Sequence, residues 1–394
     1  MSDPVHPSRR AALKFAGALG VTFLAAPALA DDAARRKLVV IVCRGAMDGL
    51  SVSPPLGDAN YERLRGPIAI PADKVLKLDG DFGLHPKLAG IHDLALAGQA
   101  RIAPAVAIPQ RIRSHFEAQD LLETGGDRLY EATTGWLNRA LAHQGRGAPI
   151  TALSIGAQSP LILKGPVQTQ SWSPGGKMTT DINRVSSILQ DLYRADPLLG
   201  PALASGLQTE ATADALDGGV SSNARDVKGF AVTAGKFLTA EGGPSVAVLS
   251  LDGFDTHANQ GAAEGQLANR LKTLDDVVDG LRQGLGPAWS QTVVVAVTEF
   301  GRTAHVNGTG GTDHGTASTL ILAGGNLKRG GVIGDWPTLR DAALFENRDL
   351  APTLDVRQVF KGVLADHLGL DRRVLDNQVF PNSRGAMAVT GLVA

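Results

Sequence analysis

Uninterrupted apolar runs mark the strands that the sequence predicts. Residues 37–43 are rich in β-branched side chains and show no polar alternation, which is typical of a central strand covered by helices on both faces. Residues 100–108 predict a second strand, shortened by Pro104 and Pro109. The remaining runs predict strands at residues 150–155, 245–251, 292–297 and 320–322, and a short extended piece at residues 161–164.

Helix-forming stretches separate most of these runs. Residues 114–123 begin with Ser114 and Glu117, which have the spacing of a capping box. Between residues 181 and 238 the pattern is mostly helical and is interrupted by a Gly/Ser/Asn cluster at residues 218–223, which predicts an inserted cap or a mobile loop. Further helices are predicted at residues 86–99, 135–143, 265–285 and 356–368.

The order of strands and helices predicts the fold class. Alternating strands and helices favour a three-layer α/β/α architecture with a mostly parallel, doubly wound sheet, here with a helical insertion near residues 181–238. A chain of 394 residues is long enough for one large α/β domain or two ordinary ones, and we expect a single domain over residues 31–394. Ligands of such folds collect outside the carboxyl ends of the parallel strands, so polar residues there are the first candidates for function.

Residues 1–30 are predicted to be a signal peptide. Arg9 and Arg10 stand in a twin-arginine pattern and precede an apolar stretch. Ala28 and Ala30 supply a cleavage signal, so we expect a periplasmic or secreted protein, exported by the twin-arginine pathway, with no stable membrane span after cleavage. The alternative is a short membrane anchor, although the stretch is shorter than the ~20 residues that span a bilayer.

Composition narrows the classes of ligand. Lysine and arginine number 38 against 39 aspartates and glutamates, so no broad field attracts nucleic acid or acidic lipid. Small uncharged or anionic ligands remain open. Only three tyrosines indicate few aromatic surfaces of the kind that stack on bases or sugars. The single cysteine, Cys43, has no disulfide partner and is expected in a buried strand.

Candidate metal ligands follow the predicted strands. Asp252 and His257 come after the run that ends at residue 251, Glu299 comes after the run at 292–297, and Asp48 lies in the loop after the first strand. Carboxylates and imidazoles together suit a divalent cation such as zinc, calcium or magnesium. Asp255 is either a further ligand or an acceptor that orients the neighbouring imidazole.

His314 precedes its predicted strand instead of following it. It therefore reaches the same edge only if that strand runs antiparallel or its loop crosses the edge. Other candidates have structural alternatives: Asp252 beside a glycine shapes a turn, and Glu299 caps a helix or pairs with Arg302. The remaining histidines of interest are expected to be loop, core or solvated residues, namely His85, His115 and His305.

Ser114 is the candidate nucleophile. A hydroxyl at a helix N-terminus meets free backbone N–H groups and the positive end of the helix dipole, although a capping box explains the residue equally well. Arg44 and Arg302 are candidate binders of an anionic group. A cation beside the serine makes an alkoxide or a metal-bound water accessible near neutral pH, so the expected reaction is hydrolysis of an ester.

These segments resemble the alkaline phosphatase and sulfatase superfamily, whose members hold one or two divalent cations at the carboxyl edge of a doubly wound sheet. The resemblance implies first-zinc ligands at Asp252 and His257. It implies a final zinc ligand at His314, a second-metal position at Glu299 and the start of the nucleophile's helix at Ser114.

A closer likeness is carried by the stretches Arg44-Gly45-x-x-Asp48-Gly49-Leu50, Arg113-Ser114-His115-Phe116 and Thr298-Glu299-Phe300-Gly301-Arg302. Through them the chain resembles a bacterial twin-arginine-exported family of unknown function, number fifteen hundred and one. Phe300 stands where the phosphatases have a second-metal histidine, which implies a one-metal enzyme, a different cation, or a protein that has lost hydrolysis and kept binding.

Two functions follow from these residues. The leading one is an exported, metal-dependent hydrolase of phosphate or sulfate esters, acting on a small anionic ester. The alternative is a non-catalytic periplasmic binding or assembly protein, in which the cation is structural and the helical insertion recognises a protein partner. In the hydrolase the cation is held by Asp252, His257 and His314, assisted by Asp48 and Glu299, and the attacking group is Ser114.

Overall fold

The computed structural model describes most of the chain. It covers residues 36–144, 152–156, 159–173 and 226–394, together with residues 189–190, 192–193, 196–197 and 199–217. The predicted signal peptide and the Gly/Ser/Asn cluster at residues 218–223 lie outside the described residues, so both stay predictions. Among the helices in these ranges, none has the length and apolar character that crossing a membrane requires.

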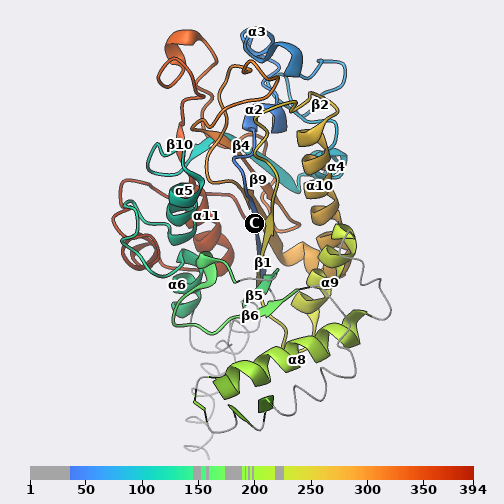
Figure 1. Cartoon of the computed structure of the whole chain (residues 1–394), viewed down its shortest axis with the longest axis vertical. Coiled ribbons are helices and arrows are strands. Elements are labelled where there is room, and N and C mark those ends of the chain that lie inside the picture. Colours follow the sequence, from blue (N-terminus) through green and yellow to red (C-terminus); the bar gives the residue numbers. More distant parts are fainter. Residues whose placement is uncertain are drawn as a thin grey trace, which may run out of the picture.

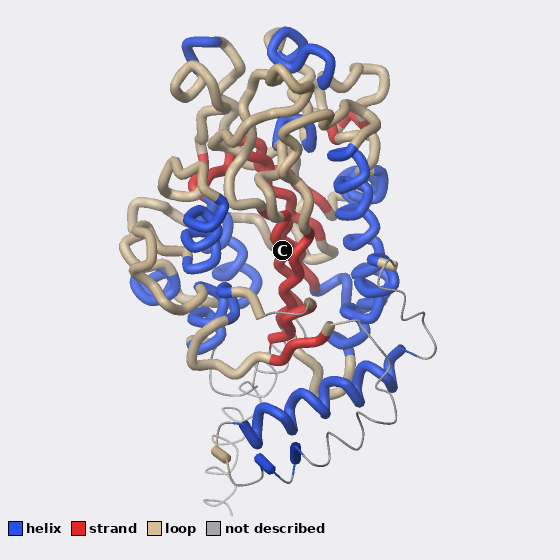
Figure 2. The backbone as a smooth tube through the Cα atoms, viewed as in Figure 1, coloured by secondary structure: helices blue, strands red, loops and turns tan. Residues whose placement is uncertain are grey.

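A central sheet of eight strands runs through the described part of the chain (Figures 1 and 2). Its order is β10-β4-β9-β8-β1-β7-β5-β6. The strands are β1 (Lys37–Cys43), β4 (Ala100–Ala107), β5 (Ala152–Ile155), β6 (Gln170–Trp172), β7 (Val246–Leu251), β8 (Thr292–Val297), β9 (Ser318–Ala323) and β10 (Leu354–Asp355). A separate antiparallel pair joins β2 (Leu76–Lys77) and β3 (Gly83–Leu84).

One strand reverses the direction of this sheet. β1 pairs parallel with β7 and β8, and β5 pairs parallel with β6 and β7. β9 pairs antiparallel with both β8 and β4, so β4 runs the same way as β1. The predicted mostly parallel sheet is confirmed. The start of β9, which His314 precedes, lies at the edge where the parallel strands end.

Helices cover both faces of the sheet (Figure 1). In β1, alternate residues from Leu38 to Val42 join one apolar core, and those from Val39 to Cys43 join the other. Successive side chains of a strand point to opposite faces, so a strand between two cores is apolar throughout. One face carries α5 (His115–Thr124), α6 (Trp136–Ala142) and α11 (Val356–Leu368), and the other carries α4 (Ala89–Leu96), α9 (Val227–Thr239) and α10 (Gln266–Leu285).

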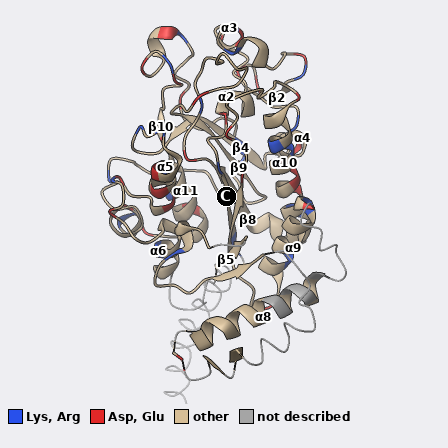
Figure 3. Ribbon diagram, viewed as in Figure 1, with Lys and Arg blue, Asp and Glu red and all other residues tan. Residues whose placement is uncertain are grey.

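The region of the predicted insertion is described only in part. There, α8 (Leu199–Asp217) contacts β6 and α9, while α9 packs against α10. Short helices elsewhere are α2 (Gly49–Val52), α3 (Tyr61–Arg65) and α12 (Arg372–Val374), and single helical turns of other types span Gly66–Ile68, Leu161–Leu163, Gly286–Gln291, Asp341–Ala343 and Leu375–Val379. The coloured ribbon of Figure 3 shows basic and acidic residues intermixed along the chain, in keeping with the net charge of -1.

Two local predictions are wrong. The piece predicted as extended contains the 3₁₀ turn Leu161–Leu163, because Pro160 supplies the carbonyl that accepts from the Leu163 N–H at 3.1 Å. The capping box is also absent: Ser114 is the N-cap residue of α5, but its side chain makes no capping hydrogen bond. The Ser114 hydroxyl is therefore not committed to the start of the helix.

Candidate metal centre

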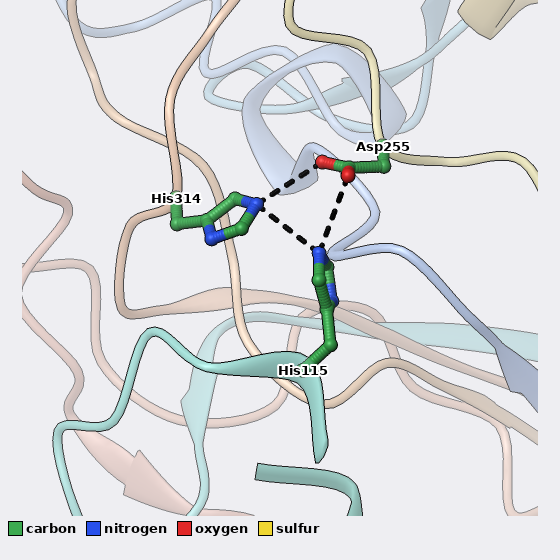
Figure 4. Close-up of side chains that lie close together, drawn as sticks. All are labelled: His115, Asp255 and His314. Atoms are coloured by element: carbon green, nitrogen blue, oxygen red, sulfur yellow. Dashed lines mark hydrogen bonds and ion pairs between the residues drawn. The ribbon is translucent and has the colours of Figure 1, made fainter. Parts of the chain in front are cut away.

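Three loops at one edge of the sheet bring three histidines and an aspartate together. Asp255 and His257 follow β7, His115 begins α5 and His314 precedes β9. Donor atoms of His115, Asp255 and His314 all lie within 4.8 Å of one another (Figure 4). The fourth residue joins them, because Nε2 of His257 lies 3.0 Å from Nε2 of His314 and 3.0 Å from Oδ1 of Asp255.

The loops approach closely because a glycine lies between them. Gly45, just after β1, has a φ of +107°, and a Cβ atom there would lie only 2.7 Å from the Asp255 backbone nitrogen. A glycine accepts both conditions at no steric cost. Its N–H donates to Oε1 of Glu299 at 2.9 Å, so the loop after β1 ties the end of β8 to the loop after β7.

Each of the three histidines has an acceptor oxygen beside its Nδ1 atom. These oxygens are Glu299 Oε1 at 2.8 Å from His115, the Arg113 carbonyl at 2.8 Å from His314, and Asp313 Oδ1 at 3.4 Å from His257. An oxygen acceptor fixes the hydrogen on Nδ1 and leaves a lone pair on Nε2. All three imidazoles therefore present the nitrogen that binds metals.

The free nitrogens converge. Nε2 of His314 lies 3.1 Å from Nε2 of His115, 3.0 Å from Nε2 of His257 and 3.1 Å from Oδ1 of Asp255. Oδ2 of the same carboxylate lies 3.3 Å from Nε2 of His115. A lone pair accepts one proton or one cation. The neighbouring lone pairs of these nitrogen and oxygen atoms therefore repel one another until a positive charge lies between them. Donor atoms of His115, His314 and Asp255 lie within 4.8 Å of one another, and His257 approaches two of these three residues, so together they form a donor set that suits zinc.

Glu299 is fully buried behind His115. Its Oε1 accepts hydrogen bonds from Gly45, His115 and Gln119, and its Oε2 accepts one from Thr298. Burial raises the pKa of this carboxyl, but the hydrogen bonds from His115 and its neighbours outweigh burial and lower the pKa overall. In return, the hydrogen bond that His115 donates to Glu299 raises the pKa of His115. Glu299 is therefore in a position to orient His115, a candidate ligand, and both of its own oxygens are engaged in hydrogen bonds.

Arg302 clamps the carboxylate of Asp255. Its Nη1 donates to Oδ1 at 2.5 Å, and its Nε donates to Oγ1 of Thr312 at 3.0 Å. Burial raises the pKa of Asp255, whereas the hydrogen bond and charge of Arg302 lower it, and the net shift is downward. Arg302 itself is only 1% exposed. It is therefore in a position to orient Asp255 and is closed to a substrate.

Phe300 forms an apolar wall on one side of the centre. Its ring stacks on His115 with centroids 4.9 Å apart and an interplanar angle of 27°, and its centroid lies 5.0 Å from that of His314. Phe300, which was expected to stand at the position of a second-metal histidine, is thus a packing partner of two imidazoles. It offers no lone pair to a second cation.

Asp48 lies in a separate buried network. It forms an ion pair with Arg65, and its Oδ2 also accepts hydrogen bonds from Ser51 at 2.8 Å and from Gln260 at 2.7 Å. Gln260 in turn accepts from Thr312 at 2.8 Å, the residue that also accepts from the Arg302 guanidinium. Asp48 is thus connected to the centre through other side chains and is not among the converging donors.

Asp252 and Arg44 face a different cavity. Asp252 is exposed and lines a cleft beside the centre together with Arg44. The Arg44 guanidinium donates to Glu123 at 2.6 Å and to Gln119 at 2.7 Å. Three residues further along the chain, Asp255 occupies the place among the donors that the sequence had suggested for Asp252.

His115 is the candidate ligand that sequence reasoning assigned to a loop or core role. The sequence did contain a signal for His115. It directly follows Ser114, and Ser114 was already expected at the functional edge because it comes after the second core strand. Ser114 is half-buried at the start of α5. No hydrogen bond of its hydroxyl is found among the described residues.

Comparison with known families gives one match. The family model described as "Protein of unknown function (DUF1501)" matches residues 35–379. No protein with a curated description matches the chain.

Solved structures resemble the chain at low identity. Ps i-CgsB in complex with k-i-k-neocarrahexaose is 11% identical, with a TM-score of 0.41 over 90% of this chain and 77% of that one. The zinc complex of the C-terminal periplasmic domain of EcEptC from Escherichia coli is 10% identical, with a TM-score of 0.37 over 89% and 87%. The phosphonate monoester hydrolase of Agrobacterium radiobacter is 12% identical, with a TM-score of 0.36 over 85% and 74%.

Proposed function

Since the chain belongs to the DUF1501 family of proteins of unknown function, we propose its activity from the site itself: it is a metal-dependent hydrolase of phosphate or sulfate esters. The observation that carries the proposal is the convergence of three Nε2 lone pairs on one carboxylate. In each histidine the other ring nitrogen faces an oxygen acceptor. That arrangement fixes the tautomer which binds a metal.

The donor set selects the kind of cation. Calcium and magnesium prefer shells made of oxygen atoms, whereas imidazole nitrogen suits zinc and other transition metals. We therefore assign the ion to His115, His257, His314 and Asp255, and we favour zinc over the two alkaline-earth ions. Asp48 and Glu299 belong to this proposal as supporting residues, because both are buried and hydrogen-bonded away from the converging atoms.

The centre opens to solvent on one side. The side chains of His257 and Asp255 are 47% and 42% exposed, while those of His115 and His314 are about half as exposed, at 25% and 24%. An ion held there supplies a Lewis acid that neutralises charge building up on an ester oxygen. A small anionic ester can approach from the exposed side, while the Phe300 ring packs against His115 and His314.

Ser114 is the proposed nucleophile. It lies next to His115, and the structure leaves its hydroxyl free of the capping bond that would explain it otherwise. Arg44 remains a candidate for contacting the anionic part of a substrate from the neighbouring cleft. Arg302 is a positioning residue, because its guanidinium is buried against Asp255.

A second function is favoured by one feature of the site. Four protein donors are enough to fill the tetrahedral shell of a structural zinc ion, whereas catalytic sites keep a position open. A protein that binds zinc in this way would be a non-catalytic periplasmic binding or assembly protein, with a protein partner in place of a substrate.

Metal analysis and an ester panel separate the two functions. The full chain is purified without chelator, its metal content is measured by mass spectrometry, and turnover of 4-nitrophenyl phosphate and 4-nitrophenyl sulfate is followed with and without added zinc. We expect about one ion per chain and turnover that a chelator removes and zinc restores. His314→Ala should lose the ion, whereas His305→Ala, a change at an exposed histidine, should keep it.

The outcomes are distinct. A bound ion without turnover of any ester supports the binding protein. If the protein contains no ion after purification and takes up none from added zinc, both functions are overturned. If the ion and turnover are present but Ser114→Ala leaves the rate unchanged, water attacks directly and the serine has no chemical role.

A further inference from the structure

A polar cleft adjoins the metal centre. It has a volume of about 670 Å³ and lies where β5 and β7 end, beside α5. Phe116, Gln119 and Asp252 line it. Phe116 directly follows His115, and Gln119 donates to the same Glu299 oxygen that fixes that imidazole. A ligand that reaches the metal centre at one end could therefore place its other end in this cleft.

The cleft gathers the exposed aromatic rings of the protein. In the ranges that the structure describes, only two phenylalanine, tyrosine or tryptophan side chains are exposed: Phe116 at 87% and Tyr130 at 66%. Both line this cleft. Exposing an apolar ring to water is unfavourable, so their presence at one opening indicates a ligand with a flat apolar face.

The backbone holds Tyr130 in place at an energetic cost. Its φ is +57°, a left-handed conformation that is a genuine outlier for a bulky side chain. Asp120 fixes this conformation by accepting the Tyr130 N–H at 3.0 Å on its Oδ2 atom. Strain of this kind persists at sites of ligand binding, where it positions a side chain in advance.

Charge and polarity indicate what the ligand is. The Arg44 guanidinium is paired with Glu123. The remaining charged residues of the lining are one basic residue, Lys164, and two acidic residues, Asp120 and Asp252. A lining of this kind does not attract a polyanion such as a nucleic acid. Among the other lining residues, hydrogen-bonding side chains are supplied by Gln119, Ser159 and Ser250.

We propose that the cleft binds a sugar unit of an oligosaccharide, with the faces of the pyranose rings stacked on Phe116 and Tyr130 and the hydroxyl groups bonded to the polar lining. Sugars combine a flat face of C–H groups with a rim of hydroxyls, which matches the aromatic and the hydrogen-bonding parts of this lining. The inference rests on the proposed function for one point only: the ester that reaches the metal would be carried by that oligosaccharide.

Binding is tested on the full chain with an array of neutral and sulfated oligosaccharides, followed by calorimetry on the tightest binder. We expect binding to weaken about tenfold in Phe116→Ala and in Tyr130→Gly, which is the lower end of the loss measured when a nucleic-acid base loses its aromatic stacking partner. Leu96→Ala, which removes an exposed apolar side chain outside the lining, should leave the affinity unchanged.

Tyr130→Gly also separates binding from folding. A glycine relieves the left-handed strain, so its melting temperature should stay level or rise while its affinity falls. If stability falls together with affinity, Tyr130 is structural and the inference fails.

The inference and the proposed function fail separately. Binding of a neutral oligosaccharide that persists in His314→Ala supports the cleft even if no ester is hydrolysed. Turnover of 4-nitrophenyl esters without binding to any sugar on the array overturns the cleft alone. Binding that survives both aromatic substitutions also overturns it.

Discussion

Oε1 of Glu299 lies 2.8 Å from Nδ1 of His115, and the glutamate side chain has no exposed surface. The imidazole is thereby held with its Nε2 atom toward His314 and Asp255. Outer residues of this kind set the orientation and basicity of a metal ligand. The consequences of that relationship are measurable without knowledge of the substrate.

Glu299→Gln should weaken metal binding without abolishing it. The amide replaces one carboxylate oxygen with a donor, so at least one of the hydrogen bonds from Gly45, His115, Gln119 and Thr298 is lost. Loss of an outer partner costs about 10–100-fold in metal affinity, which competition with a fluorescent zinc chelator measures. Glu264→Gln, at an exposed glutamate paired with Lys87, is the matched control. Equal affinities of the two variants would contradict the role assigned to Glu299.

Asp48→Asn should destabilise the protein and spare the ion. The change leaves the Arg65 guanidinium buried without its counter-charge, and breaking a buried pair costs about 3–5 kcal/mol. Urea unfolding measures this loss, and metal analysis of the folded variant should give the wild-type content.

The control for Asp48 is an exposed pair. Asp341→Asn breaks the bond between Arg63 and a carboxylate that is 68% exposed, and such surface pairs contribute about 0–1 kcal/mol. A folded Asp48→Asn protein of normal stability that had lost its ion would mean that Asp48 is itself a ligand.

Gly45→Ala should disturb the centre from a distance. The new methyl group would lie 2.7 Å from the Asp255 backbone nitrogen, at a φ of +107°, so the loop after β7 has to move. We expect zinc affinity to fall together with thermal stability. Gly80→Ala is the control, because nothing lies within 4 Å of its Cβ position. Wild-type affinity in Gly45→Ala would show that the contact between these loops is not needed to place the donors.

His367 should make stability depend on pH. It is buried in α11, where Nε2 donates to the Lys37 carbonyl at 2.9 Å and Nδ1 accepts from Asn326 at 3.0 Å. Burial, with a smaller effect of Arg36, lowers its pKa from 6.5 to about 4. Between these values the unfolded chain binds a proton that the folded chain does not, so stability falls as the pH drops from 6.5 to 4.

The expected loss from His367 between pH 7 and pH 5 is about 2 kcal/mol. Urea unfolding at both pH values measures it, and in His367→Gln the difference between the two should shrink by that amount. His305→Gln, at an exposed histidine, should retain the wild-type difference. A pH dependence that is the same in His367→Gln as in the wild type would show that another group is responsible.

The fold was largely predictable because its core strands are buried on both faces. The observed bounds Lys37–Cys43, Thr292–Val297 and Val356–Leu368 coincide with those expected from the sequence. The apolar signal of a strand is clearest where burial is complete, because the run of apolar residues is then uninterrupted. It failed at Leu161–Leu163, where the side chains are apolar but a proline-initiated turn sets the backbone.

The sequence predicted at which edge of the sheet the candidate site lies, but not which side chains meet there. The sequence placed His257 there, and it placed His314 there only if the strand that follows it runs antiparallel, as β9 does, or if its loop crosses the edge. After β7 the chain turns at Gly253, with a φ of +96°, so Asp252 lines the cleft and Asp255 joins the imidazoles. Sequence spacing cannot fix which way a side chain leaves an irregular loop, since that depends on contacts such as the one from Arg302.

The reversed direction of β9 also determines when the centre can exist during folding. His115 and His314 are 199 positions apart, and the second reaches the first only after β9 has inserted between β4 and β8. Neither an emerging polypeptide nor a fragment that stops short of β9 can bring the four side chains together, although all four precede that strand in the sequence. The ion would accordingly bind late, after the tertiary structure has formed. The ion content of a preparation would then measure the fraction of correctly folded molecules.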